Sequence, residues 1–244
     1  MIKIGLDNIK EFKSILSVAE VVFTEIKFEI DNDGLRFRGM DGGHTSYFEA
    51  NFKKEYFTTY QLDMIDNIII DTYELNKIFK RVKAQGETYL IIDNNNLIIK
   101  CFYEDNEKVF KLNSIDMEYD SPRMPYIEYP VSINTDLSKF KENVTDANLY
   151  EDKLRLKVEE NNLIIYNDNM IGSYESRIKL KESYDECSSV FSMGLINKFF
   201  KLNTLSNDVK INMGSNMPIL LTLTDSFEYV VVKLLIAPII EEDY

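Results

Sequence analysis

The chain has 244 residues, of which 45% are hydrophobic, and a formal net charge of −13 at pH 7. This length is enough for one large domain or two of ordinary size, and the absence of an eighteen-residue apolar run excludes a membrane-spanning helix. The polar N-terminal stretch excludes a secretory signal peptide, so we expect a cytoplasmic protein. Taken alone, the negative charge argues against nucleic acid as a partner, because phosphate binding depends on cationic side chains.

In the first half, apolar residues recur with helical spacing from Asn8 to about Glu20, and Asn8 is a suitable N-cap. A second helix is expected from Thr72 to about Lys83. The alternating segments between and after these helices predict strands at about 22–30, 34–39, 45–52, 67–71, 87–92, 96–103 and 108–115.

The middle segment, residues 116–131 (DMEYDSPRMPYIEYPV), contains three of the five prolines of the chain. Proline fixes φ and removes a backbone donor, so this segment is neither a helix nor a central strand. We predict a connector between two halves.

The order of elements then repeats. Helices are expected at about 135–147 and 193–203, and the final residues EEDY are an acidic tail that we expect to be disordered. The strands of this half are predicted at about 153–159, 162–167, 172–181, 187–192, 207–213, 217–224 and 227–236.

The two halves resemble each other in sequence. An offset of 128 places FEIDNDGLRF (28–37) on LKVEENNLII (156–165), with Gly34 on Asn162, and an offset of 121 places NKIFK (76–80) on NKFFK (197–201). We therefore predict an α+β fold in which each half has two helices on one face of a mostly antiparallel sheet. The predicted parts are a half-domain at 1–115, the connector at 116–131 and a half-domain at 132–244.

The predicted helices have a charge opposite to that of the whole chain. The stretches 8–17, 72–83, 135–145 and 193–203 contain ten Lys or Arg against four acids, a balance of +6, which leaves −19 for the rest of the chain. A cationic helical surface on an acidic protein favours a molecule that holds a polyanion in one place and repels it elsewhere. The helices show no aromatic interleaving for base stacking and no recognition-helix pattern, so we predict contact with phosphates and no reading of base sequence.

Enzyme chemistry has little support in the sequence. His44 is the only histidine, and no phosphate-binding loop, G-x-S-x-G or H-E-x-x-H motif is present. Cys101 and Cys187 are too few for a disulfide framework and lack the spacing of a metal site, so we expect both to be reduced. We expect neither a cofactor nor a metal ion.

Several segments together resemble the DNA sliding clamps of the proliferating cell nuclear antigen (PCNA) family, of archaeal or viral type. They are the loop FRGMDGGHTSY (37–47), the connector ending in EYP, NMGSNMPILLTL (212–223) and LLIAPIIEE (234–242). The most specific matches are Met40, Asp41 and His44 in the loop, and Ile236-Ala237-Pro238 near the end.

The resemblance implies a homotrimeric head-to-tail ring that encircles duplex DNA, without catalysis, and tethers DNA polymerase and other replication and repair enzymes. It implies loading by a separate clamp loader, no membrane partner, and a place on DNA in the cytoplasm, or in the nucleus of a eukaryote. By match and by helix face, the predicted DNA-binding residues are Lys10, Lys13, Lys77, Lys80, Arg81, Lys139, Lys141, Lys198 and Lys201.

The resemblance also implies two protein-binding surfaces. Strand 108–115 of one subunit is expected to pair with strand 173–181 of the next, as edge strands in a closed ring. Partner proteins are expected to insert a short helical turn with aliphatic and aromatic anchors into an apolar pocket beside the connector. The predicted pocket residues are Met40, His44, Tyr47, Met124, Pro218, Leu235, Ala237, Pro238 and Ile239.

Two alternatives stay open at this stage. The first is an enzyme that uses carboxylates or His44. The second is a clamp-like accessory protein that is a monomer or one subunit of a heterotrimer, because a duplicated fold of this kind need not assemble with itself.

Overall fold

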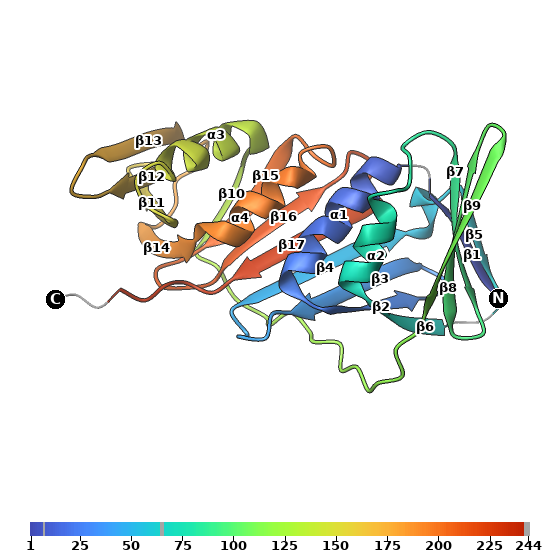
Figure 1. Ribbon diagram of the computed structural model, residues 1–244. Coiled ribbons are helices and arrows are strands. Elements are labelled where there is room, and N and C mark those ends of the chain that lie inside the picture. Colours follow the sequence, from blue (N-terminus) through green and yellow to red (C-terminus); the bar gives the residue numbers. More distant parts are fainter. Residues whose placement is uncertain (7, 64–65, 242–244) are drawn as a thin grey trace. The chain divides into compact units, whose positions relative to one another are not determined.

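The computed structural model describes residues 1–6, 8–63 and 66–241, and it divides into two compact units (Figure 1). Unit 1 comprises Met1–Arg123 and Thr224–Val232, and unit 2 comprises Met124–Leu223 and Lys233–Tyr244. Each unit has two α-helices packed on antiparallel strands, so the predicted α+β class is confirmed. The proposed half-domain boundaries at 115 and 132 stay a prediction.

Unit 1 contains two sets of antiparallel strands. One sheet has the order β5-β1-β7-β8-β9, and the strands β4, β3, β2 and β6 pair in that order. The elements are β1 (Ile2–Leu6), α1 (Ile9–Val22), β2 (Glu25–Ile30), β3 (Gly34–Met40), β4 (Ser46–Lys53), the 3₁₀ turn η1 (Lys54–Tyr56), β5 (Thr59–Leu62), β6 (Asp66–Asp71), α2 (Thr72–Phe79), β7 (Glu87–Asp93), β8 (Asn96–Tyr103) and β9 (Asn106–Asn113).

Unit 2 repeats this plan. One sheet has the order β13-β12-β11-β14, and β10 pairs with β15, which pairs with β16. The last strand, β17 (Val230–Ile236), begins in unit 1 and ends in unit 2. The other elements are β10 (Val131–Asp136), α3 (Leu137–Ala147), β11 (Lys153–Glu159), β12 (Asn162–Asp168), β13 (Ser173–Lys179), β14 (Cys187–Ser192), α4 (Met193–Phe199), η2 (Phe200–Leu202), β15 (Asp208–Met213) and β16 (Ile219–Thr224).

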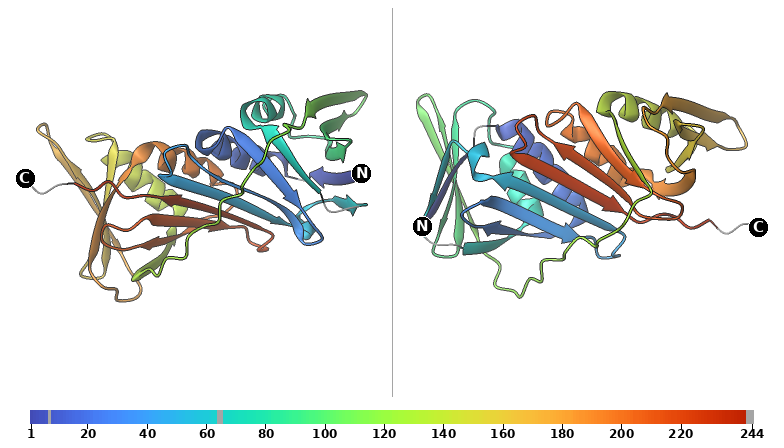
Figure 2. Two further views of the ribbon diagram at one scale, coloured as in Figure 1. Left: turned by 90° about the horizontal axis from the view of Figure 1, so that it is seen from below. Right: turned by 180° about the vertical axis from the view of Figure 1, so that it is seen from behind.

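The core of unit 1 forms where α1 and α2 lie side by side against the strands (Figures 1 and 2). Phe12 of α1 is fully buried, and its ring centroid lies 5.4 Å from that of Phe52 and 5.3 Å from that of Phe79. Burial of a phenylalanine contributes a few kcal/mol, and tilted ring pairs at this distance add to it. The aromatic residues therefore hold both helices on the sheet.

The structure explains the two sequence offsets. With an offset of 128, the hairpin β2–β3 corresponds to β11–β12, and with an offset of 121, β6 and α2 correspond to β14 and α4. The difference of seven residues falls after β4, where unit 1 contains η1 and β5. β5 pairs with β1, whereas the corresponding segment of unit 2, residues 181–186, is irregular.

Several predicted boundaries were wrong. Helix α1 continues to Val22 because Val18, Ala19 and Val22 extend its buried face, so the strand expected from residue 22 begins at Glu25. Helix α2 ends at Phe79, where backbone bonds from Arg81 to Ile78 and from Val82 to Phe79 tighten the chain into turns. The short strands β1, β5 and β10 were not predicted.

The connector is irregular up to Pro130, as predicted, while Val131 already belongs to β10. The cysteines Cys101 and Cys187 are buried and unpaired, as expected. Glu241, the first residue of the acidic tail, forms ion pairs with Lys153 at 2.9 Å and Arg155 at 2.8 Å, so this residue is ordered. Residues 242–244 of the tail lie outside the described chain.

The helix caps of unit 2 lead to a stability prediction. The Asp136 carboxylate accepts a hydrogen bond of 2.7 Å from the Lys139 N–H at the start of α3, whereas Ser192 makes no such bond at the start of α4. We expect Asp136→Ala to lower the free energy of unfolding by about 1 kcal/mol. Ser192→Ala is the matched control and should cost less than half as much. Urea unfolding at one chain concentration measures both, and equal losses would contradict the cap assignment.

Candidate nucleic-acid and partner interfaces

Five predicted DNA-binding residues lie in unit 1, and they differ in their exposure to solvent. Lys10, Lys77, Lys80 and Arg81 are exposed, whereas Lys13 is half-buried. The Nζ atom of Lys13 donates a hydrogen bond of 2.7 Å to the backbone oxygen of Val82, and burial lowers the pKa of this lysine. Lys13 therefore links α1 to the turn after α2 through this hydrogen bond. Its contact with DNA stays a prediction.

Two further cations of unit 1 have carboxylate partners. Lys77 lies 3.2 Å from Glu74 on the same helix, and Lys80 lies 3.9 Å from Glu20 of α1. Glu20 also accepts a hydrogen bond from Asn76. These contacts neutralise part of the charge between the helices, whereas no ion pair is recorded for Lys10 or Arg81 with any residue that the structure describes.

The four predicted residues of unit 2 are all exposed. Lys139 and Lys141 lie on α3, Lys198 lies on α4, and Lys201 lies in the adjoining turn η2. No carboxylate within the described part of the chain lies in ion-pair distance of these four amino groups. They are therefore available to a polyanion.

The observed helix bounds reduce the charge balance. Counted over α1, α2, α3, α4 and η2, seven lysines stand against five carboxylates, which leaves +2. The balance falls because Lys80, Arg81, Lys83 and Asp136 lie outside these elements, whereas Glu20 and Asp146 lie inside them. Lys80, Arg81 and Lys83 lie in the turns after α2. Cations at this end are favoured by the helix dipole, so the positive charge of unit 1 gathers at the C-terminal end of α2.

A cleft of about 600 Å³ lies beside the connector in unit 1, and we call it the connector cleft. It contains two of the predicted pocket residues, Met40 and His44. The other lining residues were not predicted and come from the end of α1, the loop after β3 and the connector: Val22, Phe23, Thr24, Glu25, Asp41, Gly42, Tyr119, Asp120 and Pro122.

Tyr119 fastens the connector to this cleft. Its hydroxyl donates to the backbone oxygens of Glu25 and Arg38 at 3.2 and 3.3 Å, and burial, followed by the charges of Glu25 and Glu29, raises its pKa to about 12. The tyrosine therefore stays a neutral donor at physiological pH. An aromatic residue in the connector, three positions before Pro122, was the only sequence signal for this role.

The loop at the rim of the cleft is organised by Asp41. Its carboxylate accepts hydrogen bonds from the Ser46 N–H at 2.5 Å, the Thr45 hydroxyl at 2.9 Å and the Gly43 N–H at 3.3 Å. Burial would raise the pKa of Asp41, but the hydrogen bonds from Ser46 and Thr45 outweigh it and lower the pKa. His44 adopts a positive φ of 53° in this loop and is exposed.

Tyr47, another predicted pocket residue, lies in the core. It has no exposed surface, and its hydroxyl donates to Glu49 at 2.5 Å. Burial and the Glu49 charge raise the pKa of Tyr47. In this structure Tyr47 supports β4 and does not line the connector cleft.

The remaining predicted pocket residues belong to unit 2. Leu235 is 7% exposed, and the others are half-buried. The backbone N–H of Ile239 donates a hydrogen bond of 2.7 Å to Val190 of β14, which holds the end of the chain against this unit. The half-buried residues are Met124, Pro218, Ala237, Pro238 and Ile239.

The two strands expected at subunit joints are both sheet edges. β9 pairs on one side with β8, and β13 pairs on one side with β12. Along each strand, exposed side chains alternate with half-buried ones. An edge of this kind presents unpaired backbone groups that a further strand can satisfy.

A duplicated α+β chain with open edge strands and lysine-bearing helices has the construction of a clamp subunit. A family model described as "Proliferating cell nuclear antigen, N-terminal domain" matches residues 1–122. The chain therefore belongs to the proliferating cell nuclear antigen family.

Similar proteins agree with this assignment. The chain is 29% identical over 244 residues to the DNA polymerase sliding clamp of Methanothermobacter thermautotrophicus and 28% identical to that of Methanobrevibacter smithii, with complete coverage of both chains in each case. The clamp of Methanococcus vannielii is 28% identical over 87% of this chain and 89% of its own. The fold matches a solved structure described as the C-terminal region of FEN-1 bound to A. fulgidus PCNA, with a TM-score of 0.90, 22% identity and complete coverage of both chains.

No helix in the described residue ranges has the length and hydropathy needed to cross a membrane. No group of three or more His, Cys, Asp or Glu side chains in those ranges is arranged to hold a metal ion.

The loop at the rim of the connector cleft leads to a prediction about pH. Because its pKa is lowered in the folded chain, Asp41 stabilises the fold fully above the ordinary value of 3.8, and this contribution is lost as the pH falls through the lowered value. We expect Asp41→Asn to lower the free energy of unfolding by about 1 kcal/mol at pH 7 and by clearly less at pH 3. Urea unfolding at both pH values measures this difference.

Asp120→Asn is the matched control, because Asp120 is an exposed carboxylate of the same cleft. It should leave stability unchanged at both pH values. A loss at pH 3 as large as that at pH 7 for Asp41→Asn would contradict the role assigned to the carboxylate.

Proposed function

We propose that three copies of the chain form a closed ring around duplex DNA and tether DNA polymerase and other replication and repair enzymes to it. The observation that supports this most directly is the full-length match to proteins named DNA polymerase sliding clamps. A ring of this kind acts by topology and raises the local concentration of its partners, so the chain is a clamp and not an enzyme.

The proposed DNA contacts are the nine helix cations predicted from the sequence. Exposure and lack of a carboxylate partner favour Lys10, Arg81, Lys198 and Lys201 as direct phosphate ligands, together with the α3 lysines. Lys13, Lys77 and Lys80 contribute partly shielded charge. Contacts of this kind are independent of base sequence, as sliding requires, and they weaken as the salt concentration rises.

The connector cleft is the proposed docking site of partner proteins. It is large enough for one turn of a peptide helix, and Met40 provides an adaptable apolar surface. Glu25, Asp41 and Asp120 place three carboxylates around it, which favours partner segments that carry Lys or Arg beside their apolar anchors. For unit 2, the predicted residues Met124, Pro218, Leu235, Ala237, Pro238 and Ile239 are proposed as a partner-binding surface of that unit.

The proposed place of action is on DNA, in the cytoplasm of an archaeal-type cell. The relatives named above are archaeal proteins. The lone histidine gives no support to the alternative of an enzyme, because His44 lies in an exposed turn with its backbone N–H bonded to Asp41.

Retention on circular DNA tests the proposed function. We expect the chain, once loaded on a nicked circular plasmid by a clamp loader and ATP, to stay bound through gel filtration and to be lost when the plasmid is linearised. Lys198→Glu/Lys201→Glu should reduce retention at least about fivefold, because two phosphate contacts become repulsive in each subunit. Lys53→Glu/Lys54→Glu, which changes exposed lysines away from the four helices, is the control. Equal retention on circular and linear DNA would contradict encirclement.

Peptide binding tests the docking site. We expect Met40→Lys to weaken binding of a synthetic peptide from the C-terminal region of FEN-1 at least about tenfold, because a charge would enter the apolar part of the cleft. Met117→Lys is the matched control, since Met117 is a 42% exposed methionine of the connector outside the cleft. Isothermal titration calorimetry measures both, and equal affinities of the two variants would exclude this docking site.

A further inference from the structure

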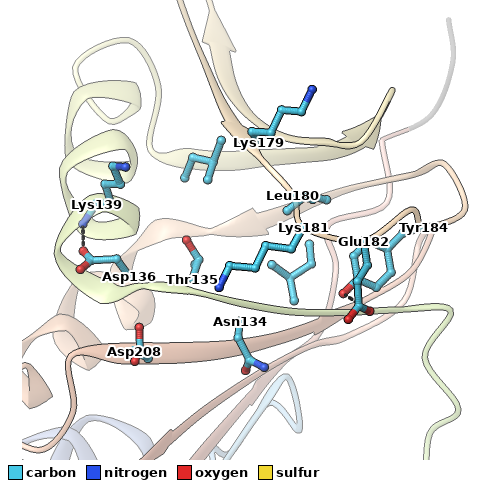
Figure 3. Close-up of a pocket in the computed structure, with 12 residues that line it drawn as sticks. Asn134, Thr135, Asp136, Lys139, Lys179, Leu180, Lys181, Glu182, Tyr184 and Asp208 are labelled. Carbon is cyan, nitrogen blue, oxygen red and sulfur yellow. Dashed lines mark hydrogen bonds between the residues drawn. The ribbon is translucent and has the colours of Figure 1, made fainter.

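A cleft of about 640 Å³ in unit 2 lies along strand β10, and we call it the β10 cleft (Figure 3). Residues 133–136 of β10 form one wall. The other wall consists of residues 178–182 and Tyr184, which come from the end of β13 and the irregular segment after it. Lys139 and Asp208 complete the lining.

The corresponding place in unit 1 is occupied by a strand. β7 corresponds to β15 at an offset of 121, and the pairings of these strands with β1 and β10 make Ile4 correspond to Ile133 and Gly5 to Asn134. On the other side of β1 lies β5, which pairs with it antiparallel. In unit 2 the segment that corresponds to β5, residues 181–186, is irregular. The β10 cleft therefore corresponds to the space that β5 fills in unit 1.

The exposure of the two edges differs as this correspondence predicts. Gly5 is buried, and its backbone oxygen accepts a hydrogen bond of 3.0 Å from the Thr58 N–H. Asn134 is exposed, and β10 pairs only with β15 among the described strands. By the same register, the N–H and C=O of Asn134 point away from β15 and toward the cleft. An outer strand in this state can accept a further strand.

The charges of the cleft are distributed unevenly. Asp136 and Asp208 lie at one side and Glu182 at the other, and the side chain of Lys181 extends between them toward β10 (Figure 3). The Asp136 carboxylate is engaged as the cap of α3, and Glu182 accepts a hydrogen bond of 3.4 Å from Tyr184. Lys181 is exposed and forms no ion pair with any residue in the described ranges. Its amino group is therefore complementary to a carboxylate supplied from outside the chain.

We propose that the β10 cleft binds an extended segment of a partner protein, which adds a strand antiparallel to β10 and places an acidic side chain against Lys181. In unit 1 the neighbour at this place is Thr58, because a Cβ atom on Gly5 would lie 2.4 Å from its hydroxyl oxygen. Asn134 has that Cβ atom, so a β-branched residue is disfavoured here in the added strand. An unbranched glutamate avoids the contact and can extend toward Lys181.

The added strand leaves the joint of the proposed ring free. β4 of unit 1 corresponds to β13, and it has β3 on one side and β17 on the other while β5 lies on β1. The side chain of Lys179, at the end of β13, points away from β10 (Figure 3). Both edges of unit 2 can therefore be occupied at the same time, and binding in the cleft does not depend on the ring.

Titration with a synthetic peptide tests the inference. The probe is a fluorescently labelled peptide with the sequence of residues 56–63, YFTTYQLD, that carries Thr58→Glu. We expect it to bind the full chain with a Kd below about 1 mM, at least about fivefold more tightly than the same peptide with Thr58→Lys. Lys181→Glu in the chain should reverse this preference. Lys53→Glu, which changes an exposed lysine of unit 1, is the control and should leave it unchanged.

A second variant separates strand addition from attraction between charges. Asn134→Pro removes the N–H that faces the cleft, and an outer strand tolerates proline on its free side, so the urea midpoint should stay unchanged. We expect this variant to bind the probe at least about fivefold more weakly. In the original chain, bound peptide should slow hydrogen exchange of the Asn134 N–H, a readout that needs no variant. Absence of binding at 1 mM peptide, equal affinity for both peptides, or unchanged exchange at Asn134 would each overturn the proposal.

Discussion

The backbone hydrogen bonds at the outer sides of β9 and β13 are the constraint on which the proposed ring depends. A strand edge without a partner leaves a row of N–H and C=O groups to water and invites pairing with another chain. In unit 1, the outer strands of the five-stranded sheet are β9, with eight residues, and the short β5, with four. In unit 2, the outer strands of the four-stranded sheet are β13 and β14. A head-to-tail ring needs one edge from each unit at every joint, and β9 and β13 are the edges assigned to the joints of the proposed ring.

The internal duplication shows how small changes produce these different edges. The two units share helices and hairpins, and they differ by seven residues after β4, where only unit 1 has η1 and β5. Gly5 shows how closely the chain entering β5 lies against β1, since a Cβ atom there would lie 2.4 Å from the Thr58 hydroxyl oxygen. A short insertion thus adds an outer strand to one sheet without altering the helices.

Much of the fold could be predicted from the sequence, because the long amphipathic helices and alternating hairpins carry strong local signals. The three strands and the helix end that were not predicted have physical explanations. β1, β5 and β10 are only four to six residues long, and the pairing partners that define them are distant in sequence. After the end of α2, the Lys13 amino group donates a hydrogen bond to the Val82 carbonyl, a contact between residues 69 positions apart. Periodicity alone carries no information about such contacts.

The candidate sites were predicted less completely than the fold. The lysines could be identified because exposed charge on an amphipathic helix is visible in the sequence. The connector cleft could not, since Val22, Phe23 and Tyr119 come together only when the connector crosses the end of α1. Tyr47 was predicted to line the pocket because of the family resemblance. In the structure its side chain is buried, and its hydroxyl donates a hydrogen bond to Glu49.

The distribution of charge links these surfaces to one function. In an acidic chain, an exposed lysine without a carboxylate partner attracts anions most strongly, and the lysines on the helices of unit 2 and the lysine at the end of β13 are among those of this kind. The group on the helices suits a polyanion of any sequence. In the proposed ring, the joint between subunits would cover the lysine at the end of β13. The helix lysines would then be the main cationic surface that DNA meets.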